Sequence, residues 1–149
     1  MPDRGTTHKA GVGYGSLSYI SVIAAATLLP ARDWNGKVIG LNLAGGFTLT
    51  LPSVAQAGAG WRATFRVETA PTTAYIITEA TASDTNVMTG GINELEVDTS
   101  DDGPYSAAFT QVNFVANTAV VGDYIDIECN GSRFYVRGQT NADGGITLT

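Results

Sequence analysis

The sequence is poor in the residues on which many enzymes and metal sites depend. Its 149 residues include a single histidine, His8, and a single cysteine, Cys129. Ser-His-Asp and Cys-His sites need a histidine held against a nucleophile, and zinc sites need several Cys or His ligands. We therefore expect no catalytic residues, no metal and no cofactor. Cys129 lies in an alternating apolar run, which predicts a buried and inert thiol.

Positive charge is also scarce. The chain has 8 Lys and Arg against 14 Asp and Glu, a net charge of −6, and no basic residue between Val67 and Ser132. Because nucleic-acid binding rewards dense Lys and Arg, this balance argues against a nucleic-acid partner. Charged residues make up only 15% of the chain, against about 25% in an average domain. The resulting neutral surface suits lasting contact with other proteins.

Long apolar runs are missing as well. The apolar stretch at residues 20–29 is too short to cross a bilayer. Residues 1–5 do not lead into the apolar core of a signal peptide. We expect a protein made in the cytoplasm, without secretion and without a membrane partner.

Glycine and short alternating segments are what the chain does contain. Residues 1–16 are glycine-rich and without periodicity, which predicts an extended N-terminal arm before a domain at 17–149. Residues 99–108 are expected to form a loop. No long amphipathic helix is indicated, so the chain predicts an all-β, single-domain antiparallel β-sandwich, jelly-roll-like fold or barrel. The expected strands are 19–23, 37–43, 47–51, 61–69, 74–78, 92–98, 111–116, 124–129, 133–138 and 146–148.

Two turns give specific expectations about strand pairing. Gly45-Gly46 predicts a tight hairpin between segments 37–43 and 47–51. Asn130-Gly131 predicts a two-residue type I′ hairpin, which would place Glu128 opposite Arg133. Opposite charges in such a cross-strand pair contribute about 0.2–1 kcal/mol.

Acidic residues are the group numerous enough to suggest a site. Asp98, Asp101 and Asp102 fall within one expected turn, and oxygen ligands at this density can hold Ca²⁺, although the spacing differs from that of an EF-hand. The other interpretation is a solvated acidic turn. Paired carboxylates also serve glycosidases, so a small hydrolase is a minor alternative. The glycines at 11–15 resemble a phosphate loop, but no strand precedes them and no helix follows, which favours a linker.

Candidate interaction surfaces follow from the arm and from strand alternation. Segment 61–69 would present arginines on its outer face, and segment 92–98 would present acids. Each face is either simply solvated or meets the opposite charge of a neighbouring copy. The candidate protein-interface residues are Arg4, Lys9, Val12, Tyr14, Leu17, Arg62, Arg66, Glu94, Glu96 and Asp98.

The succession of strand and turn motifs is itself informative. After the glycine-containing arm come a strand ending in Leu-Pro at 47–52, Gly58-Ala59-Gly60-Trp61, Thr69-Ala70-Pro71-Thr72-Thr73-Ala74-Tyr75-Ile76, Gly90-Gly91-Ile92-Asn93-Glu94, Asn113-Phe114-Val115-Ala116, Val121-Gly122-Asp123-Tyr124-Ile125 and Phe134-Tyr135-Val136-Arg137-Gly138. This order resembles the small decoration (capsid cement) proteins of tailed bacteriophages, over residues 17–149.

The resemblance implies a β-sandwich or jelly-roll-like domain, often trimeric, on the exterior of a virion. The expected function is that of a non-enzymatic structural protein, which binds the major capsid protein on the outside of the head and stabilises it by mass action. The expected partners are the major capsid protein and copies of the chain in a homotrimer. Similar motifs also occur in tail-fibre, baseplate and receptor-binding modules of phages, which are the alternative.

Overall fold

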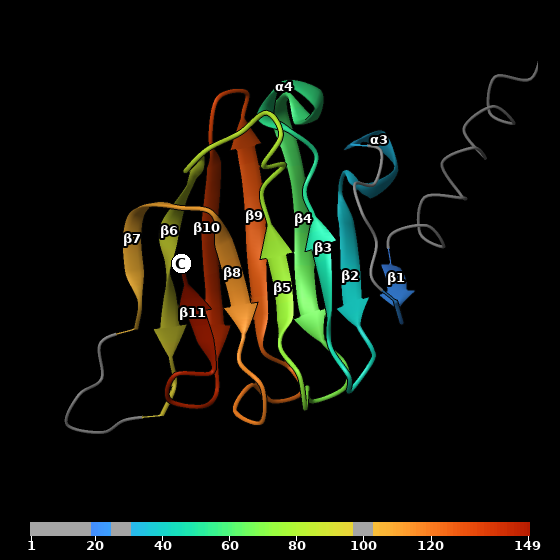
Figure 1. Ribbon diagram of the computed structural model, residues 1–149, viewed down its shortest axis with the longest axis vertical. Coiled ribbons are helices and arrows are strands. Elements are labelled where there is room, and N and C mark those ends of the chain that lie inside the picture. Colours follow the sequence, from blue (N-terminus) through green and yellow to red (C-terminus); the bar gives the residue numbers. More distant parts are fainter. Residues whose placement is uncertain (1–18, 25–30, 97–102) are drawn as a thin grey trace, which may run out of the picture.

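A computed structural model of the chain describes residues 19–24, 31–96 and 103–149. Short strands dominate these residues, and the helices are single turns (Figure 1). In chain order the elements are β1 (Tyr19–Val22), α3 (Ala31–Trp34), β2 (Lys37–Leu41), β3 (Phe47–Thr50), α4 (Val54–Ala57), β4 (Ala59–Val67), β5 (Tyr75–Thr78), β6 (Met88–Glu94), β7 (Tyr105–Phe109), β8 (Gln111–Phe114), β9 (Tyr124–Asn130), β10 (Phe134–Thr140) and β11 (Ile146–Leu148).

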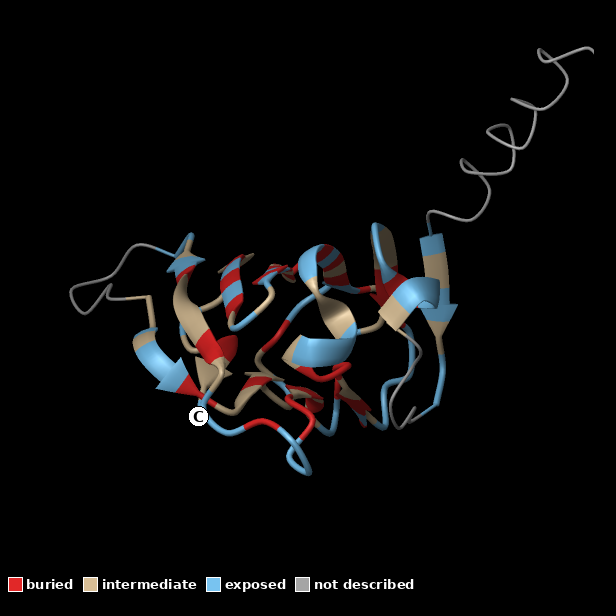
Figure 2. Cartoon of the chain, turned by 90° about the horizontal axis from the view of Figure 1, so that it is seen from above, coloured by how far each residue is buried: buried red, intermediate tan, exposed pale blue. Residues whose placement is uncertain are grey.

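The strands form two sheets that pack face to face as a sandwich (Figure 2). The seven-stranded sheet has the order β1-β2-β4-β9-β10-β6-β7, and the four-stranded sheet the order β11-β8-β5-β3. The all-β prediction is confirmed. The expectation of purely antiparallel pairing is wrong, because β1–β2, β2–β4, β6–β10 and β3–β5 are parallel. From β2 to β5 the chain alternates between the two sheets. Strand β4 therefore pairs with β2, and β5 with β3, each pair running in the same direction.

The Gly45-Gly46 turn is a crossing between layers. The hairpin predicted there is wrong, because β2 belongs to the seven-stranded sheet and β3 to the four-stranded one. Gly46 has φ of +65°, and a Cβ added to it would overlap the carbonyl oxygen of Thr73. Glycine is therefore required for both conformation and space. A glycine pair indicates a tight turn but does not say which sheet the next strand joins.

The hairpin of β9 and β10 is present, but its predicted register is wrong. Glu128 lies opposite Tyr135, and Gly131 and Ser132 form the tip. The reason is the side chain of Asn130, whose Oδ1 accepts hydrogen bonds from the backbone N–H groups of Ser132 (3.0 Å) and Arg133 (2.9 Å). Asn130 thus stabilises the turn from its base instead of occupying its tip.

Strand β7 lies where a loop was expected over residues 99–108, and β6 begins earlier than predicted. Gly90 precedes the predicted strand but lies inside β6, with φ of +149° at an irregular point in the β6–β7 register. Glycine in a strand often marks such a bulge, which bends the strand without ending it. The bulge allows β6 to continue past Gly90 and to pair with β7.

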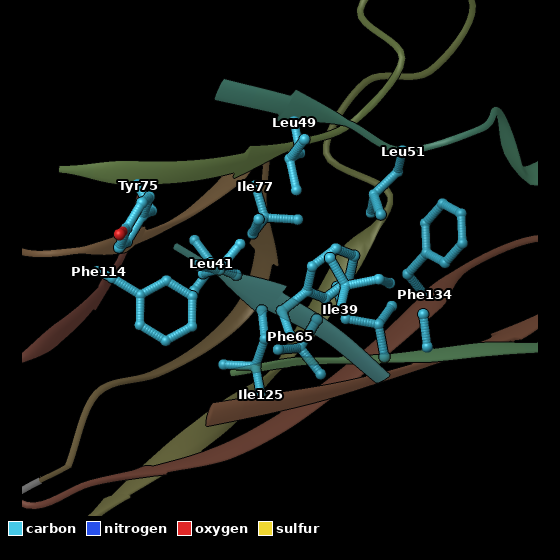
Figure 3. Packing of buried hydrophobic residues seen from close by; sticks show 14 of the residues in the cluster. Ile39, Leu41, Leu49, Leu51, Phe65, Tyr75, Ile77, Phe114, Ile125 and Phe134 are labelled. Atoms are coloured by element: carbon cyan, nitrogen blue, oxygen red, sulfur yellow. The ribbon is translucent and has the colours of Figure 1, made fainter. Parts of the chain in front are cut away.

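The hydrophobic core fills the space between the two sheets (Figure 3). Its largest fully buried side chains include Phe65, Tyr75, Phe114 and Phe134. Cys129 belongs to this core with 1% of its surface exposed, and burial raises the pKa of its thiol. The prediction that Cys129 is buried is confirmed.

Three acids from the region without basic residues are buried. Asp123 is 0% exposed, Glu79 1% and Asp84 6%. Each accepts hydrogen bonds from backbone N–H groups, at distances of 2.9–3.0 Å. Such donors offset the loss of water around a carboxylate. These acids therefore fix loops of the fold.

Candidate interaction surfaces

The structure describes only some of the predicted interface residues. Arg62, Arg66, Glu94 and Glu96 are among the described residues. The arm at 1–16, the proposed Ca²⁺ turn at 98–102, and the candidates Arg4, Lys9, Val12, Tyr14, Leu17 and Asp98 lie outside them. Their roles stay predictions.

Glu94 and Glu96 bind the turn that joins β10 to β11. The Oε1 atom of Glu94 accepts a hydrogen bond from the N–H of Gly144 at 3.1 Å, and the Oε2 atom of Glu96 accepts one from the N–H of Asp143 at 3.2 Å. Strand β6 ends at Glu94, whereas the predicted strand ran from residue 92 to residue 98; residues 95 and 96 are not part of a strand. The structure gives these two carboxylates a role within their own chain and does not bring them to the arginines of β4.

Arg62 and Arg66 lie on the outer face of the seven-stranded sheet, as the alternation of β4 predicts. They are exposed, whereas Trp61, Phe65 and Val67 are buried. The guanidinium of Arg66 lies 6.0 Å from the centre of the Tyr124 ring on β9, within the range of a cation–π interaction. This face is polar and aromatic, and in Figure 2 no described helix or strand covers it.

A groove of about 780 Å³ crosses this outer face. Residues of β2, β4, β9, β10, β6 and β7 line it. The charged and aromatic side chains among them include Arg62, Tyr105, Asp126, Glu128, Tyr135 and Arg137. The sheet register fixes their order: Glu128 lies between Arg62 and Tyr135, and Asp126 lies opposite Arg137. Neighbouring strands therefore place donors, acceptors and aromatic rings side by side.

The polar groups of the groove are partly paired with one another. The hydroxyl of Thr64 donates to Oδ1 of Asp126 at 2.5 Å. Glu128 and Arg137 form an ion pair at 3.9 Å, in which both side chains are more than half exposed. An exposed pair of this kind contributes at most about 1 kcal/mol. The two partners are free to exchange part of this contact for a ligand.

Asp126 and Glu128 also bear on the interpretation as a hydrolase. Both line the groove, at alternate positions of β9. Residues two apart on one strand project from the same face of the sheet. Glycosidases hold their two carboxylates on either side of the scissile bond. Two neighbours on the floor of a groove do not surround a bond in this way, so the arrangement favours binding over hydrolysis.

The free edge of β1 is a second surface. None of its residues is buried, and among the described strands it pairs with β2 alone. The backbone N–H of Asn42 donates to the carbonyl of Val22 at 2.9 Å, which holds the chain beside β1 at Asn42, the residue before Leu43. Tyr19 is 45% exposed, Ile23 65% and Leu43 39%. We name Tyr19, Ile23 and Leu43, together with the edge of β1 that has no partner among the described strands, the β1 edge.

Glu68 attaches β1 to the rest of the sheet. Its carboxylate accepts hydrogen bonds from the Tyr19 hydroxyl and, at 2.6 Å, from the Ser21 hydroxyl. The hydrogen bond to Glu68 is the main cause that raises the pKa of Tyr19 above its ordinary value. A Cβ on Gly40 would overlap the Glu68 carboxyl, so glycine at this position of β2 leaves room for Glu68 to reach β1.

Two general kinds of site, a membrane-spanning helix and a metal-binding cluster, are absent from the described residues. Within residues 19–24, 31–96 and 103–149, no helix has the length and apolar character needed to span a membrane. In the same residues no group of three or more His, Cys, Asp and Glu side chains is placed to hold a metal ion.

The sequence did not predict the groove, although the signals for its parts are present. Asp126, Glu128, Tyr135 and Arg137 alternate with apolar residues in the expected strands, which places them on an outer face. Tyr105 fell in an expected loop. The neighbours of each strand, which create the groove, follow from the sheet order and not from alternation.

Comparisons of the chain with protein-family models, with curated protein sequences and with solved structures found no match. The β1 edge and the groove are therefore the features of the chain that bear on its function.

Proposed function

We propose that this chain is a non-enzymatic structural protein of a tailed-phage virion, a decoration protein that binds the outer surface of the head and stabilises it. The observation that supports the proposal is the β1 edge. One edge of β1 has no partner among the described strands, and the apolar side chains of Tyr19, Ile23 and Leu43 are exposed. Two surface features suited to protein association thus coincide.

An edge of this composition is unusual for a protein that acts alone. Exposed edges are ordinarily protected by Lys, Pro, bulges or inward charges, because they can pair with another chain. The described segment of residues 19–24 reads Tyr-Ile-Ser-Val-Ile-Ala and contains no charge and no proline. Its pairing with β2 is regular over all four residues. These features favour the addition of a strand from another protein, with backbone hydrogen bonds giving affinity.

Attachment through such an edge explains how a small protein would stabilise a shell. A ligand that binds the assembled state and not the free subunits shifts the equilibrium toward assembly. The added strand would come from the major capsid protein or from a second copy in a homotrimer. The low charge of the chain, 15% of its residues, is consistent with a surface that stays in contact with protein.

The test uses purified phage heads that lack this protein. The full chain is added, the heads are sedimented, and bound protein is quantified together with the temperature at which the heads release DNA. We expect saturable binding and a higher release temperature. Ile23→Lys should weaken binding at least tenfold, or about 1.4 kcal/mol, because it places a charge on the β1 edge.

Val121→Lys is the matched control. Val121 is similarly exposed, at 61%, but lies in the turn before β9, a strand that β2 and β4 separate from β1 in the sheet. Its replacement should leave binding unchanged. Wild-type protein that fails to bind heads, or that electron microscopy of virions finds on the tail alone, would refute the proposal. A tail location would instead favour a tail-fibre, baseplate or receptor-binding module, the alternative that the groove makes specific.

A further inference from the structure

The groove on the outer face of the seven-stranded sheet is not used by attachment through the β1 edge. We propose that this groove is a binding site for a neutral carbohydrate, with Tyr135 and Tyr105 stacking on sugar rings and Arg62, Asp126, Glu128 and Arg137 bonding sugar hydroxyls. The inference concerns a separate surface and stands whether or not the chain decorates a capsid.

The shape of the groove favours a ligand of moderate size. Its volume of about 780 Å³ lies within the roughly 300–1,000 Å³ of typical small-molecule sites. The groove is open along the face of a sheet in which β2, β4, β9, β10 and β6 each pair with a neighbour on both sides, and β7 is the last described strand at its end. An open groove on a rigid floor accommodates an extended chain of units, and an oligosaccharide is such a chain.

Two exposed tyrosines supply the apolar part of the site. Tyr135 on β10 is 50% exposed and Tyr105 on β7 is 75% exposed, although both have large apolar rings. Between these strands lies β6, which contributes Thr89 and Gly90 to the groove lining and has Gly91 opposite Tyr105. Small residues between two rings leave a low strip where a flat ligand can lie. The C–H faces of pyranose rings are apolar enough to pack on tyrosine, and the hydroxyl of Tyr135 accepts a hydrogen bond from Nδ2 of Asn130 at 3.4 Å.

The charges in the groove point to a ligand that is itself neutral. Two arginines and Lys37 line it together with two carboxylates, and the carboxylates lie on β9 between Arg62 of β4 and Arg137 of β10. A phosphate, a polyanion or a basic peptide would meet repulsion from part of this set. A sugar hydroxyl both donates and accepts hydrogen bonds, so it can bond a carboxylate and a guanidinium at once. The arginines of the groove are hydrogen-bond donors and its carboxylates are acceptors, and a polyhydroxylated ligand can bond to both kinds of group.

The pairing already present supports the same conclusion. Thr64 holds Asp126 in place through its hydroxyl, so one acceptor is oriented before any ligand arrives. The Glu128–Arg137 pair is exposed and weak, so its groups can turn to new partners at little cost. One fixed acceptor and one adaptable pair give both orientation and tolerance, which suits a site for repeating sugar units.

The experiment titrates the full chain with soluble neutral hexasaccharides of α-1,4-glucose, β-1,4-glucose, β-1,4-mannose and β-1,4-N-acetylglucosamine, with a heparin hexasaccharide as the charged comparison. Backbone amide NMR locates the site, and calorimetry measures affinity. We expect at least one neutral sugar to bind with Kd of about 1 mM or tighter. The shifted resonances should belong to β4, β9, β10, β6 and β7.

Matched variants separate stacking from general damage. Tyr135→Ala and Tyr105→Ala should each weaken sugar binding at least tenfold, and Tyr135→Phe should stay within about threefold because the ring is kept. Tyr19→Ala is the control: Tyr19 is another exposed tyrosine on the same sheet, but it does not line the groove. Its removal should leave sugar binding unchanged. The NMR spectra of all variants report whether the fold is retained.

Three results would overturn the inference. The first is no binding of any neutral sugar at 10 mM, and the second is stronger binding of the heparin fragment than of every neutral sugar. The third is a Tyr135→Ala variant that loses attachment to phage heads while no sugar binds, which would make the groove a protein contact. Failure of Ile23→Lys to affect head binding would count against the β1 edge and leave the sugar result standing, so the two proposals fail separately.

Discussion

Replacement of Asp123 by asparagine tests the account of the buried carboxylates most directly. Asp123 is completely buried immediately before β9. Its Oδ1 atom accepts hydrogen bonds from the backbone N–H and the side-chain amide of Asn141, both at 2.9 Å. Its Oδ2 atom accepts from the backbone N–H of Val120 at 2.9 Å and from the hydroxyl of Thr140 at 3.0 Å. All four of these groups donate to the carboxylate, so the site demands two acceptor atoms.

An asparagine at this position offers one acceptor and one donor. In one orientation its NH₂ group faces the backbone N–H of Asn141, and in the other that of Val120. A backbone N–H cannot turn round, so either orientation loses a hydrogen bond to a charged acceptor and leaves a buried donor unpaired. Those losses cost about 1.5–3 and 1–3 kcal/mol respectively. We expect Asp123→Asn to lower the free energy of unfolding by about 3–5 kcal/mol and Tm by roughly 6–20 °C.

The assay is urea unfolding followed by the fluorescence of the buried Trp34 and Trp61. Asp143→Asn is the control, because Asp143 is exposed, and it should change stability by less than about 0.5 kcal/mol. A loss below about 1 kcal/mol for Asp123→Asn, or one equal to that of the control, would show that the four hydrogen bonds do not hold this loop as described.

Three further predictions concern single positions. Gly90→Ala should destabilise the fold by more than about 3 kcal/mol in thermal melts, because its φ is +149° and the new Cβ would overlap the carbonyl oxygen of Val136; a melt like that of the wild type would contradict this. The thiol of Cys129, whose pKa burial raises, should react with a disulfide reagent slowly in native protein and rapidly in urea; equal rates would argue against burial. Glu68→Gln should return the pKa of Tyr19 toward 10.0, as an alkaline absorbance titration referenced to Tyr19→Phe would show. Since folding raises that pKa, the linked stability is present below pH 10 and is lost as pH rises through the folded value; an unchanged titration in Glu68→Gln would exclude the hydrogen bond as the cause.

Alternation in the sequence predicts faces of strands well. In β4 the apolar residues of the predicted pattern, Trp61, Phe65 and Val67, are buried, and Arg62 and Arg66 are exposed. The reason is that a half-buried strand must place every second side chain in the core. The same physics makes nearly all expected strands appear close to their predicted positions.

Partners of strands are a different matter, because alternation contains no information about neighbours. The turns at Gly45-Gly46 and at Asn130 both exist, yet one crosses between sheets and the other shifts the register. In each case a long-range contact decides: Gly46 passes against the carbonyl of Thr73, and Asn130 bonds the turn with its side chain. Local turn propensity is too weak to outweigh such contacts.

The groove shows the same limit at the level of a site. Its tyrosines, Tyr105 and Tyr135, lie on strands separated by β6, and the bulge at Gly90 is what brings β7 into the sheet. In the sequence, Gly90-Gly91 is equally compatible with a turn, so it does not predict the bulge or the pairing of β7 with β6. Alternation in β4 therefore predicts that Arg62 lies on the outer face. It does not predict the groove, because the groove depends on which strands are neighbours in the sheet.

The two proposed surfaces lie on one sheet but use different directions of it. A strand added at the β1 edge extends the sheet in its own plane, since backbone hydrogen bonds run between neighbouring strands. The groove opens perpendicular to that plane, because side chains stand out from the faces of a sheet. Its lining begins at β2 and continues to β7, so it includes no residue of β1. A partner strand at the edge would leave Tyr135 and Tyr105 accessible, so the two proposals do not exclude each other.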